Sequence, residues 1–419
     1  MPNGHEGDAQ STPRNLYAFG LTSFFNDTAS EMAYWVLPAF LLTIGAGPAQ
    51  LGLIEGVAES VASLAKLFSG YLADRWKRRK PLVVSGYVVA NLVKPLLALT
   101  NWWAEVLAIR FVDRLAKGAR GTPRDVMVAE SVPEERIGSA YGLIQAMDSA
   151  GAIAGPMFAL LILTRYGDTR SVFWAAAIPG VLSALVAFFG IRETQRGAGV
   201  NLAAPASGKQ DLHRDDLPSL PARSMEASAG ANAALSRSYY YVLFTVGLFS
   251  LGNSSDMFLV LRAEDVGIGI ALAPLLGLVF NVTYTLTAWP AGRLSDRMSR
   301  RVVAALGYIV FGLVYLAFAM GSSTKLIWAA MAFYGLFYSL TVPVLKALVV
   351  ETVVPEARGR ALGIYFSVSS VAALLASVIT GELWKVYGPQ VPFFVSAGTA
   401  LVSAALLLVW RLRSGPLRS

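Results

Sequence analysis

Long apolar segments recur along the chain from residue 16 to residue 411. Each comes close to the roughly 20 residues that a helix needs to cross the hydrocarbon core of a bilayer. The composition agrees, since 55% of the 419 residues are hydrophobic and only 15% are charged. A typical soluble domain has about 25% charged residues. The pattern therefore predicts an all-α polytopic membrane protein.

The apolar segments form two sets of six. They lie at 16–43, 50–73, 81–100, 102–128, 138–164 and 171–191, and at 238–263, 267–292, 302–321, 326–350, 360–386 and 390–410. The stretch between the sets is rich in Ala, Ser, Pro and Arg and lacks periodicity, which is typical of a flexible linker. We expect a tail at 1–15, a six-helix bundle at 16–191, a linker at 192–237, a second six-helix bundle at 238–411 and a tail at 412–419.

The two halves repeat one another in sequence. Residues 70–75 (GYLADR) match residues 292–297 (GRLSDR), and 292 minus 70 is 222. Pro-Glu-x-Arg at 133–136 recurs at 355–358 with the same offset, and Tyr-Gly at 166–167 recurs at 387–388 with an offset of 221. Tandem bundles of this kind hold their substrate near the middle of the membrane, at the interface between the halves.

Basic residues predict the orientation. The stretches DRWKRRK (74–80) and DRMSRR (296–301) follow the second and eighth apolar segments, whereas the connections at 45–50 and 321–325 carry little charge. Cytoplasmic loops are the ones enriched in Lys and Arg, so both termini are expected in the cytoplasm. The same bias accounts for the net charge of +8, and no nucleic-acid partner is expected.

The doubled loop at 70–79 and 292–301 resembles the signature loop between helices 2 and 3 of the major facilitator superfamily, G-x-L-a-D-r-x-G-R-[RK]. Lys77 and Ser299 stand where that family usually has glycine. The resemblance covers almost the whole chain, and it implies twelve helices and alternating access. It also implies that Asp74 helps to latch the outward-facing state against the start of helix 11, near Arg358. The residues marked in this way for conformational change are Gly70, Asp74, Arg75, Arg78, Gly292, Asp296, Arg297 and Arg300.

Two shorter motifs also resemble this family. Arg114-Leu-Ala-Lys-Gly118 is similar to its R-x-x-x-G motif, and Gly151-Ala-Ile-Ala-Gly155-Pro156 is similar to the G-x-x-x-G-P motif of antiporters. The glycine pair expected after the second motif is missing, and ordinary packing of small residues between helices is the alternative interpretation. The strings SFFNDTASEM, RFVDRLAKGARGTPRD and LGNSSDMFLVLRA resemble a bacterial branch of permeases whose substrate is unassigned.

Several charged residues fall inside the apolar segments. A carboxylate at bilayer depth costs on the order of 2.5–3.5 kcal/mol, so such residues face the bundle interior or a wet cavity. Burial raises the pKa of a carboxyl and a nearby arginine lowers it, which is what a proton-coupled cycle requires. The candidates for proton coupling are Asp27, Glu31, Glu59, Asp113, Arg114 and Asp148. Among them, Asp27 is the expected proton carrier and Glu31 a ligand or relay. The alternative is a paired network that only closes the first bundle.

The second half offers mostly neutral hydrogen-bonding groups beside aromatic rings. The candidates for substrate contacts are Arg110 from the first half, with Asn253, Asp256, Asn281, Tyr284, Tyr334 and Tyr338 from the second. For any single Tyr or Asn, packing between helices is an equal alternative. Cysteine is absent and the two histidines, His5 and His213, lie outside the apolar segments. A dedicated nickel, zinc or copper site is therefore disfavoured, while a manganese or ferrous path built from carboxylates stays open.

These observations favour a secondary active transporter, namely a proton-coupled exporter of a small organic molecule. Uptake or exchange of an anionic metabolite on Arg110, Arg114 and Lys117, or carboxylate-lined export of a metal ion or siderophore, are the alternatives. No phosphate-binding G-x-x-x-x-G-K-[ST] loop and no Ser-His arrangement occurs, which disfavours an ATP-driven pump or an enzyme. A non-transporting sensor is unlikely because the linker is too short for a signalling domain. We expect no cofactor, the proton gradient as energy source, a small-molecule substrate, the bilayer as surroundings and a monomeric chain.

Overall fold

The computed structural model describes residues 13–75, 78–133, 136–194, 235–354 and 357–413, and all of the regular structure there is helical. The first half contains α1 (Pro13–Tyr34), α2 (Leu37–Thr43), α3 (Pro48–Arg75), α4 (Lys80–Val93) with the 3-10 turn η1 (Lys94–Leu99), α5 (Trp103–Glu130), α6 (Ile137–Tyr166) and α7 (Thr169–Gly190).

The second half follows the same plan. It contains α9 (Arg237–Gly252), α10 (Met257–Asp265), the 3-10 turn η3 (Ile270–Leu272), α11 (Ala273–Arg297), α12 (Arg300–Met320), α13 (Thr324–Glu351), α14 (Arg358–Tyr387) and α15 (Gln390–Arg413). Each apolar segment of the sequence thus corresponds to one helix, or to a helix interrupted once near its end.

Most of these helices are apolar enough to cross a bilayer, and the exceptions are informative. Within the described residues, nine helical segments are long and apolar enough to span a membrane. The segments outside this set are α1, α3 and α5, although α3 and α5 each run for 28 residues. These three helices carry most of the charged residues singled out inside the apolar segments, the exceptions being Asp148 on α6 and Asp256 before α10. Their polarity therefore marks a face turned away from lipid.

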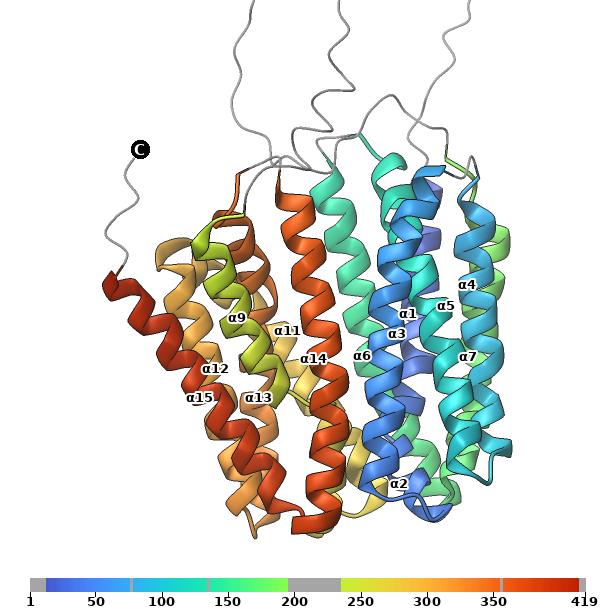
Figure 1. Cartoon of the computed structure of the whole chain (residues 1–419). Helices are drawn as coiled ribbons and strands as arrows, with labels where there is room; N and C mark the ends of the chain where they lie inside the picture. The colour runs from blue at the N-terminus through green and yellow to red at the C-terminus, as the bar shows by residue number, and fades with distance from the viewer. Residues whose placement is uncertain (1–12, 76–77, 134–135, 195–234, 355–356, 414–419) are drawn as a thin grey trace, which may run out of the picture.

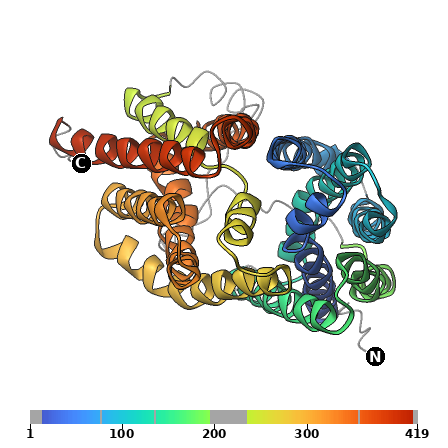
Figure 2. The ribbon, with the colours of Figure 1, turned by 90° about the horizontal axis from the view of Figure 1, so that it is seen from below.

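The chain packs as two bundles (Figures 1 and 2). In the first, α1 contacts α6 and α7, and α3 contacts α5; in the second, α12 contacts α13 and α15. The bundles meet mainly at two helix pairs, α3 with α14 and α6 with α11, and α2 also contacts α10. We call the end of the molecule at which α1 begins and α15 ends the terminal side, and the opposite end, where α2 lies, the far side (Figure 1).

Glycines bring the two bundles into backbone contact on the far side. A β-carbon on Gly381 of α14 would lie 2.5 Å from the carbonyl oxygen of Pro48, and one on Gly52 of α3 would overlap the carbonyl of Ser377. Nearer the middle, the Ser60 hydroxyl donates to the carbonyl of Ser370 at 3.1 Å. The far-side ends of α3 and α14 are therefore pressed together, with no room for a side chain between them.

Ion pairs fix equivalent loops on the terminal side. Arg79, which is buried, contacts Glu130 at the end of α5 at 2.5 Å, and its backbone N–H donates to Glu193. Arg300, at the start of α12, pairs with Glu351 at the end of α13. The two glutamates differ by 221 positions (351 minus 130), so the repeat seen in the sequence extends to these contacts.

Candidate functional site

Two interruptions of the helices occupy corresponding positions in the two halves. The first lies at Trp35 and Val36, between α1 and α2, and the second at residues 253–256, between α9 and α10. Asp256 and Trp35 are 221 positions apart, the offset of the repeat. Backbone that leaves the helix at membrane depth is tolerated where it borders a cavity, and paired interruptions are a pointer to a transporter's binding site.

A central cavity of about 500 Å³ lies at these interruptions and is bordered by both halves. Its volume falls in the range of small-molecule sites, about 300–1,000 Å³. The first half contributes Glu31, Tyr34, Trp35, Glu59, Ser63, Arg114 and Lys117. The second half contributes residues 253–256, Phe280, Asn281, Tyr338, Phe366, Ser369, Ser370, Ala373 and Ser377.

Trp35 connects the two halves at the edge of the central cavity. Its indole Nε1–H donates to Glu31 Oε2 at 2.7 Å, one turn earlier on α1. A β-carbon on Gly277 of α11 would overlap the same indole ring, so the ring rests directly on the backbone of the other half. The orientation of the Glu31 carboxylate is therefore coupled to the position of α11.

The G-x-x-x-G-P motif packs against the two acidic positions of α1. A β-carbon on Gly155 would lie 2.7 Å from the Cβ atom of Glu31, and one on Gly151 would lie 3.1 Å from the Cβ atom of Asp27. The motif thus does pack small residues between helices, as the alternative interpretation held. Its contact is with the backbone that carries Asp27 and Glu31, two of the residues expected from the sequence to couple protons.

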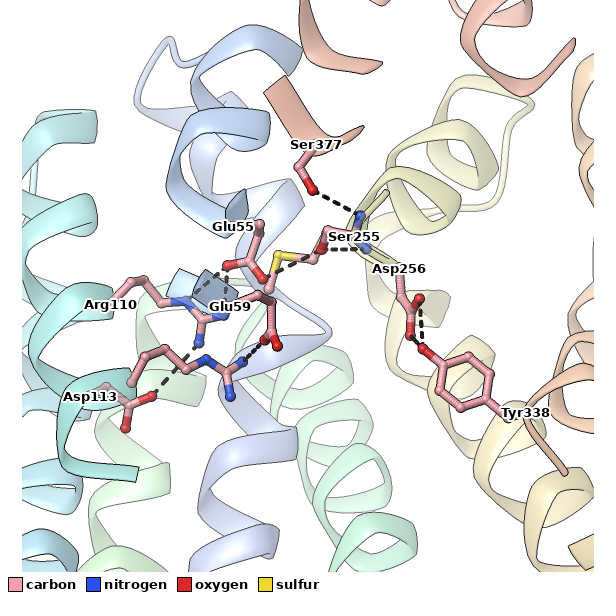
Figure 3. Close-up of polar contacts among 10 residues, drawn as sticks. Glu55, Glu59, Arg110, Asp113, Ser255, Asp256, Tyr338 and Ser377 are labelled. Carbon is pink, nitrogen blue, oxygen red and sulfur yellow. Dashed lines mark hydrogen bonds and ion pairs between the residues drawn. The ribbon is translucent and has the colours of Figure 1, made fainter. Parts of the chain in front are cut away.

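Behind the central cavity lies a cluster of buried charges. Glu55, which has no exposed surface, accepts from Arg110 Nε at 3.0 Å and Nη2 at 2.6 Å. Asp113 lies 3.9 Å from Arg110 Nη1 and 3.5 Å from Lys94 Nζ. The guanidinium of Arg110 also sits 5.9 Å from the centre of the Tyr34 ring. Figure 3 shows Glu55, Arg110 and Asp113 drawn together in this cluster. Arg110 is therefore compensated by two carboxylates.

The cluster reaches the second half through a hydroxyl. The Ser255 hydroxyl donates to Glu55 Oε2 at 3.4 Å, and the backbone N–H of Ser255 donates to the Ser377 hydroxyl of α14 at 3.2 Å (Figure 3). The interruption between α9 and α10 is thus held by one side chain from α3 and another from α14. Movement of one bundle against the other would change the contact with Glu55, whereas the contact with Ser377 lies within the second bundle.

A second cavity, of about 330 Å³, extends from the central cavity toward the terminal side. Glu59, Ser63, Arg114 and Lys117 border both cavities. Arg114 Nη2 lies 3.4 Å from Glu59 Oε1, whereas no carboxylate among the described residues comes within 4.0 Å of the Lys117 ammonium as an ion pair. The other charged residues at this second cavity are Asp27, Lys66, Arg120, Arg124, Asp125 and Asp148.

Two carboxylates at the second cavity have different surroundings. Asp148 Oδ2 is 4.0 Å from Arg124 Nη1, and the same guanidinium also pairs with Asp125 through Nη2. Asp27 accepts from the Asn26 amide at 3.0 Å, and within the described residues it forms no ion pair. Arg114, another of the candidates for proton coupling, pairs with Glu59 and not with Asp27.

A continuous polar chain nevertheless joins Asp27 to the second half. It begins with the Asn26 amide, whose Oδ1 accepts from Asn91 at 3.3 Å, and Asn91 Oδ1 accepts from Lys94 at 3.0 Å. Lys94 then leads through Asp113, Arg110 and Glu55 to Ser255. Neither Asn91 nor Lys94 was among the sequence candidates, although a lone lysine inside an apolar segment is the kind of signal that selected the others.

On the side of the central cavity that the second half contributes, Asp256 is the main hydrogen-bond acceptor. Tyr334 donates to its Oδ1 atom at 2.6 Å. Tyr338 lies 3.2 Å from Oδ1 and 3.0 Å from Oδ2, as Figure 3 shows. Asn281 borders the central cavity and also donates to the Ala152 carbonyl of α6 at 3.0 Å, a contact between the halves. The ring of Tyr284 stacks on that of Phe280 with centroids 6.2 Å apart. Phe280 borders the central cavity, whereas Tyr284 lies behind it and does not.

The structure leaves some candidates outside its description. The structure does not describe the side-chain surroundings at six of these positions, namely Gly70, Asp74, Arg75, Gly292, Asp296 and Arg358. The predicted latch between Asp74 and Arg358 therefore stays a prediction. Of the remaining loop residues, Arg78 and Arg297 are exposed on the terminal side. Within the described residues, no group of three or more His, Cys, Asp or Glu side chains is arranged to hold a metal ion.

Two repeated bundles around a shared polar cavity define a membrane transporter of the two-bundle class. A model of the Major Facilitator Superfamily matches residues 19–261 and 242–419, so the chain belongs to this superfamily. The resemblance noted in the sequence and its all-helical fold are thereby confirmed, and the protein is a transporter rather than an enzyme.

Individual relatives agree with this assignment. The chain is 31% identical over 415 residues to an uncharacterised MFS-type transporter of Methanocaldococcus jannaschii, with 97% of both chains covered. It is 25% identical over 400 residues to the multidrug resistance protein MdtG of Escherichia coli, with 93% of each covered. A mutant of the nucleoside transporter NupG has the same fold, with a TM-score of 0.75 at 13% identity, over 94% of this chain and 99% of that one.

Proposed function

We propose that this protein exports a small organic molecule by alternating access, driven by the proton gradient. The observation that carries the proposal is the central cavity, which both halves border at their helix interruptions and which continues toward the terminal side through the second cavity. On the far side, α3 and α14 meet at glycines. Such an arrangement suits a site that faces one side of the membrane at a time.

We place the terminal side in the cytoplasm of a bacterial cell, with the chain in the inner membrane. The support is the clustering of basic residues there, including Arg78, Arg79, Lys80 and Arg300, since cytoplasmic loops are enriched in such residues. With this orientation the cavity is open to the cytoplasm and closed to the periplasm. It is then in the state that would accept a cytoplasmic substrate for export.

We assign proton coupling to Asp27 first. Its carboxylate is partly exposed at the second cavity, has an amide rather than a cation as its close partner, and starts the polar chain that ends at Ser255. Protonation there would change the charge at one end of a chain whose other end touches the second bundle. Glu31, at the central cavity, and Asp148, at the second cavity, are the next candidates.

The test measures accumulation of candidate compounds in inside-out vesicles with an imposed proton gradient. The first compounds are chosen from the kinds of substrate that the relatives' names indicate. MdtG is described as a multidrug resistance protein, so a panel of antibacterial compounds is the first choice. Asp27→Asn should abolish gradient-driven accumulation while sparing counterflow, which needs no proton. Glu382→Gln, at an exposed carboxylate of α14, is the matched control. Uphill transport by Asp27→Asn with an unchanged pH profile would make Asp27 structural.

Uptake or exchange of an anionic metabolite is the second candidate function. It relies on Arg110, Arg114 and Lys117 as ligands, but Glu55 and Asp113 compensate Arg110, and Glu59 compensates Arg114. Lys117 is then the cation best able to accept an anion. Accumulation of an anionic probe in right-side-out vesicles, lost in Lys117→Met, would favour this second function over export.

A further inference from the structure

Asp256 presents a carboxylate to the central cavity without a positively charged partner. It lies at the end of the interruption between α9 and α10, and it is bordered by α13. Within the described residues, no Lys or Arg comes within 4.0 Å of it as an ion pair; the acidic groups that do have such partners include Glu55, Glu59 and Asp113. Asp256 is half-buried, and a charge withdrawn from water is normally paired, so the missing partner points to a ligand.

The phenols around Asp256 hold it as a hydrogen-bond acceptor. Tyr334 and Tyr338 both donate to it, in three contacts of 2.6–3.2 Å. An ionised carboxylate offers about four acceptor positions. These contacts stabilise the carboxylate in a fixed orientation and still leave acceptor capacity for a further donor. Because Tyr338 also borders the central cavity, that donor would arrive from the cavity.

A second acceptor lies three residues earlier in the same interruption. The Oδ1 atom of Asn253 is buried and has no hydrogen-bond donor among the described residues. Asn253 borders the central cavity together with Asp256. A buried acceptor without a donor costs free energy, so the pair of acceptors is complementary to a group with several N–H bonds.

Aromatic rings complete the surroundings. Phe280, Tyr338 and Trp35 border the same cavity. The ring of Phe280 lies 5.0 Å from that of Tyr338 and 6.3 Å from that of Trp35, centroid to centroid. The faces of such rings attract cations, including ammonium groups. An apolar or aromatic body attached to an ammonium would pack against these rings.

From these observations we propose that Asp256 and Asn253 form the binding site for the ammonium group of a small organic amine whose apolar body lies against Phe280, Tyr338 and Trp35. The ammonium donates to the free acceptor positions of the Asp256 carboxylate and to Asn253 Oδ1. This inference rests on the proposed function only in making the amine the transported substrate; binding itself does not require transport.

The test measures equilibrium binding to the purified full chain in lipid nanodiscs, with three probes of one shape. Phenethylamine carries the ammonium, phenethyl alcohol is its neutral counterpart, and phenylacetate is an anion of similar size. The wild-type protein should bind phenethylamine about tenfold or more tightly than either of the other two. Asp256→Asn should remove this preference, and Tyr334→Phe, which keeps the ring and deletes one donor, should reduce it partially.

Glu264→Gln is the matched control, because Glu264 is a carboxyl on α10 that does not border the central cavity. It should leave the preference for the amine unchanged. All variants are compared by thermal unfolding, so that a misfolded protein is recognised before binding is read. Equal binding of the three probes by the wild type, or a preference that survives in Asp256→Asn, would overturn the proposal.

The outcome separates this inference from the proposed function. Transport of neutral or anionic compounds without amine binding would support the proposed export and refute the proposed amine site. Specific amine binding without flux in proteoliposomes would support the proposed amine site and refute the proposed export.

Discussion

Oε1 of Glu55 lies 2.6 Å from Nη2 of Arg110, and both side chains are buried between α3 and α5. The other oxygen of Glu55 faces Ser255 of the second half. A single carboxylate thus compensates a buried arginine and touches the interruption that carries Asp256. This relationship connects the stability of the first bundle to the site between the bundles.

Removing one partner of this pair should destabilise the protein strongly. Arg110→Met leaves the Glu55 carboxylate buried without its cation, and breaking a buried pair in this way costs about 3–5 kcal/mol. Thermal unfolding in nanodiscs measures the loss. The double variant Glu55→Gln with Arg110→Met should recover most of it, because no unpaired charge is left. A single variant as stable as the wild type would mean that the pair is solvated rather than buried.

The contact between α6 and α1 gives a second prediction. Gly155→Ala places a β-carbon 2.7 Å from the Cβ atom of Glu31, so α1 and α6 must separate. Overpacking of this kind costs about 1–3 kcal/mol, and gradient-driven transport should fall because Glu31 moves. Gly142→Ala on the same helix is the control, since a β-carbon there meets no atom within 4 Å. Equal transport by both variants would show that the α1–α6 contact is unimportant for coupling.

The polar chain from Asp27 to Ser255 gives a third prediction. Asn91→Leu removes the link between Asn26 and Lys94 in a buried position outside the central cavity. Variants along such a network change coupling by about 0.5–2 kcal/mol, roughly 2- to 30-fold. We expect a lower ratio of accumulated substrate at a fixed proton gradient, with counterflow retained. Thr164→Val, at an exposed hydroxyl of α6, should change neither quantity.

Much of the fold was predictable from apolar periodicity and the internal repeat. Every predicted span contains helix, because about 20 apolar residues in a bilayer have few other ways to satisfy their backbone. The interruptions at Trp35 and at residues 253–256 were not predicted. The first is followed by Pro38 in the first turn of α2, and a proline there removes the backbone N–H that would continue α1. The second contains no proline and is held by tertiary contacts, such as the bond from the Ser255 backbone to Ser377.

The candidate site was predicted in its residue types and less well in its pairings. The free-energy cost of a charge inside the membrane pointed to Asp27, Glu31 and Glu59 as candidates, and all three border one of the two cavities. Depth along a helix could not show that Arg114 turns to Glu59 and not to Asp27, because helix rotation is set by packing between helices. For the same reason, Arg110 was expected at the substrate and instead lies against Glu55.

The central claim is that the two bundles move against each other so that the cavity opens to one side at a time. The natural absence of cysteine allows spin labels to be placed at chosen pairs without removing native thiols. One pair, Pro133→Cys with Ser299→Cys, joins exposed loops of the two halves on the terminal side. The other pair, Tyr166→Cys with Ser322→Cys, joins exposed positions on the far side.

The most direct measurement compares both label distances by electron–electron double resonance in the labelled parent and in Gly52→Leu. A side chain at Gly52 would strike the carbonyl of Ser377 and wedge α3 from α14 on the far side, with no substrate needed. Alternating access predicts a longer far-side distance together with a shorter terminal-side distance. A far-side distance that lengthens while the terminal-side distance stays the same or lengthens, or no change in either pair, would contradict it.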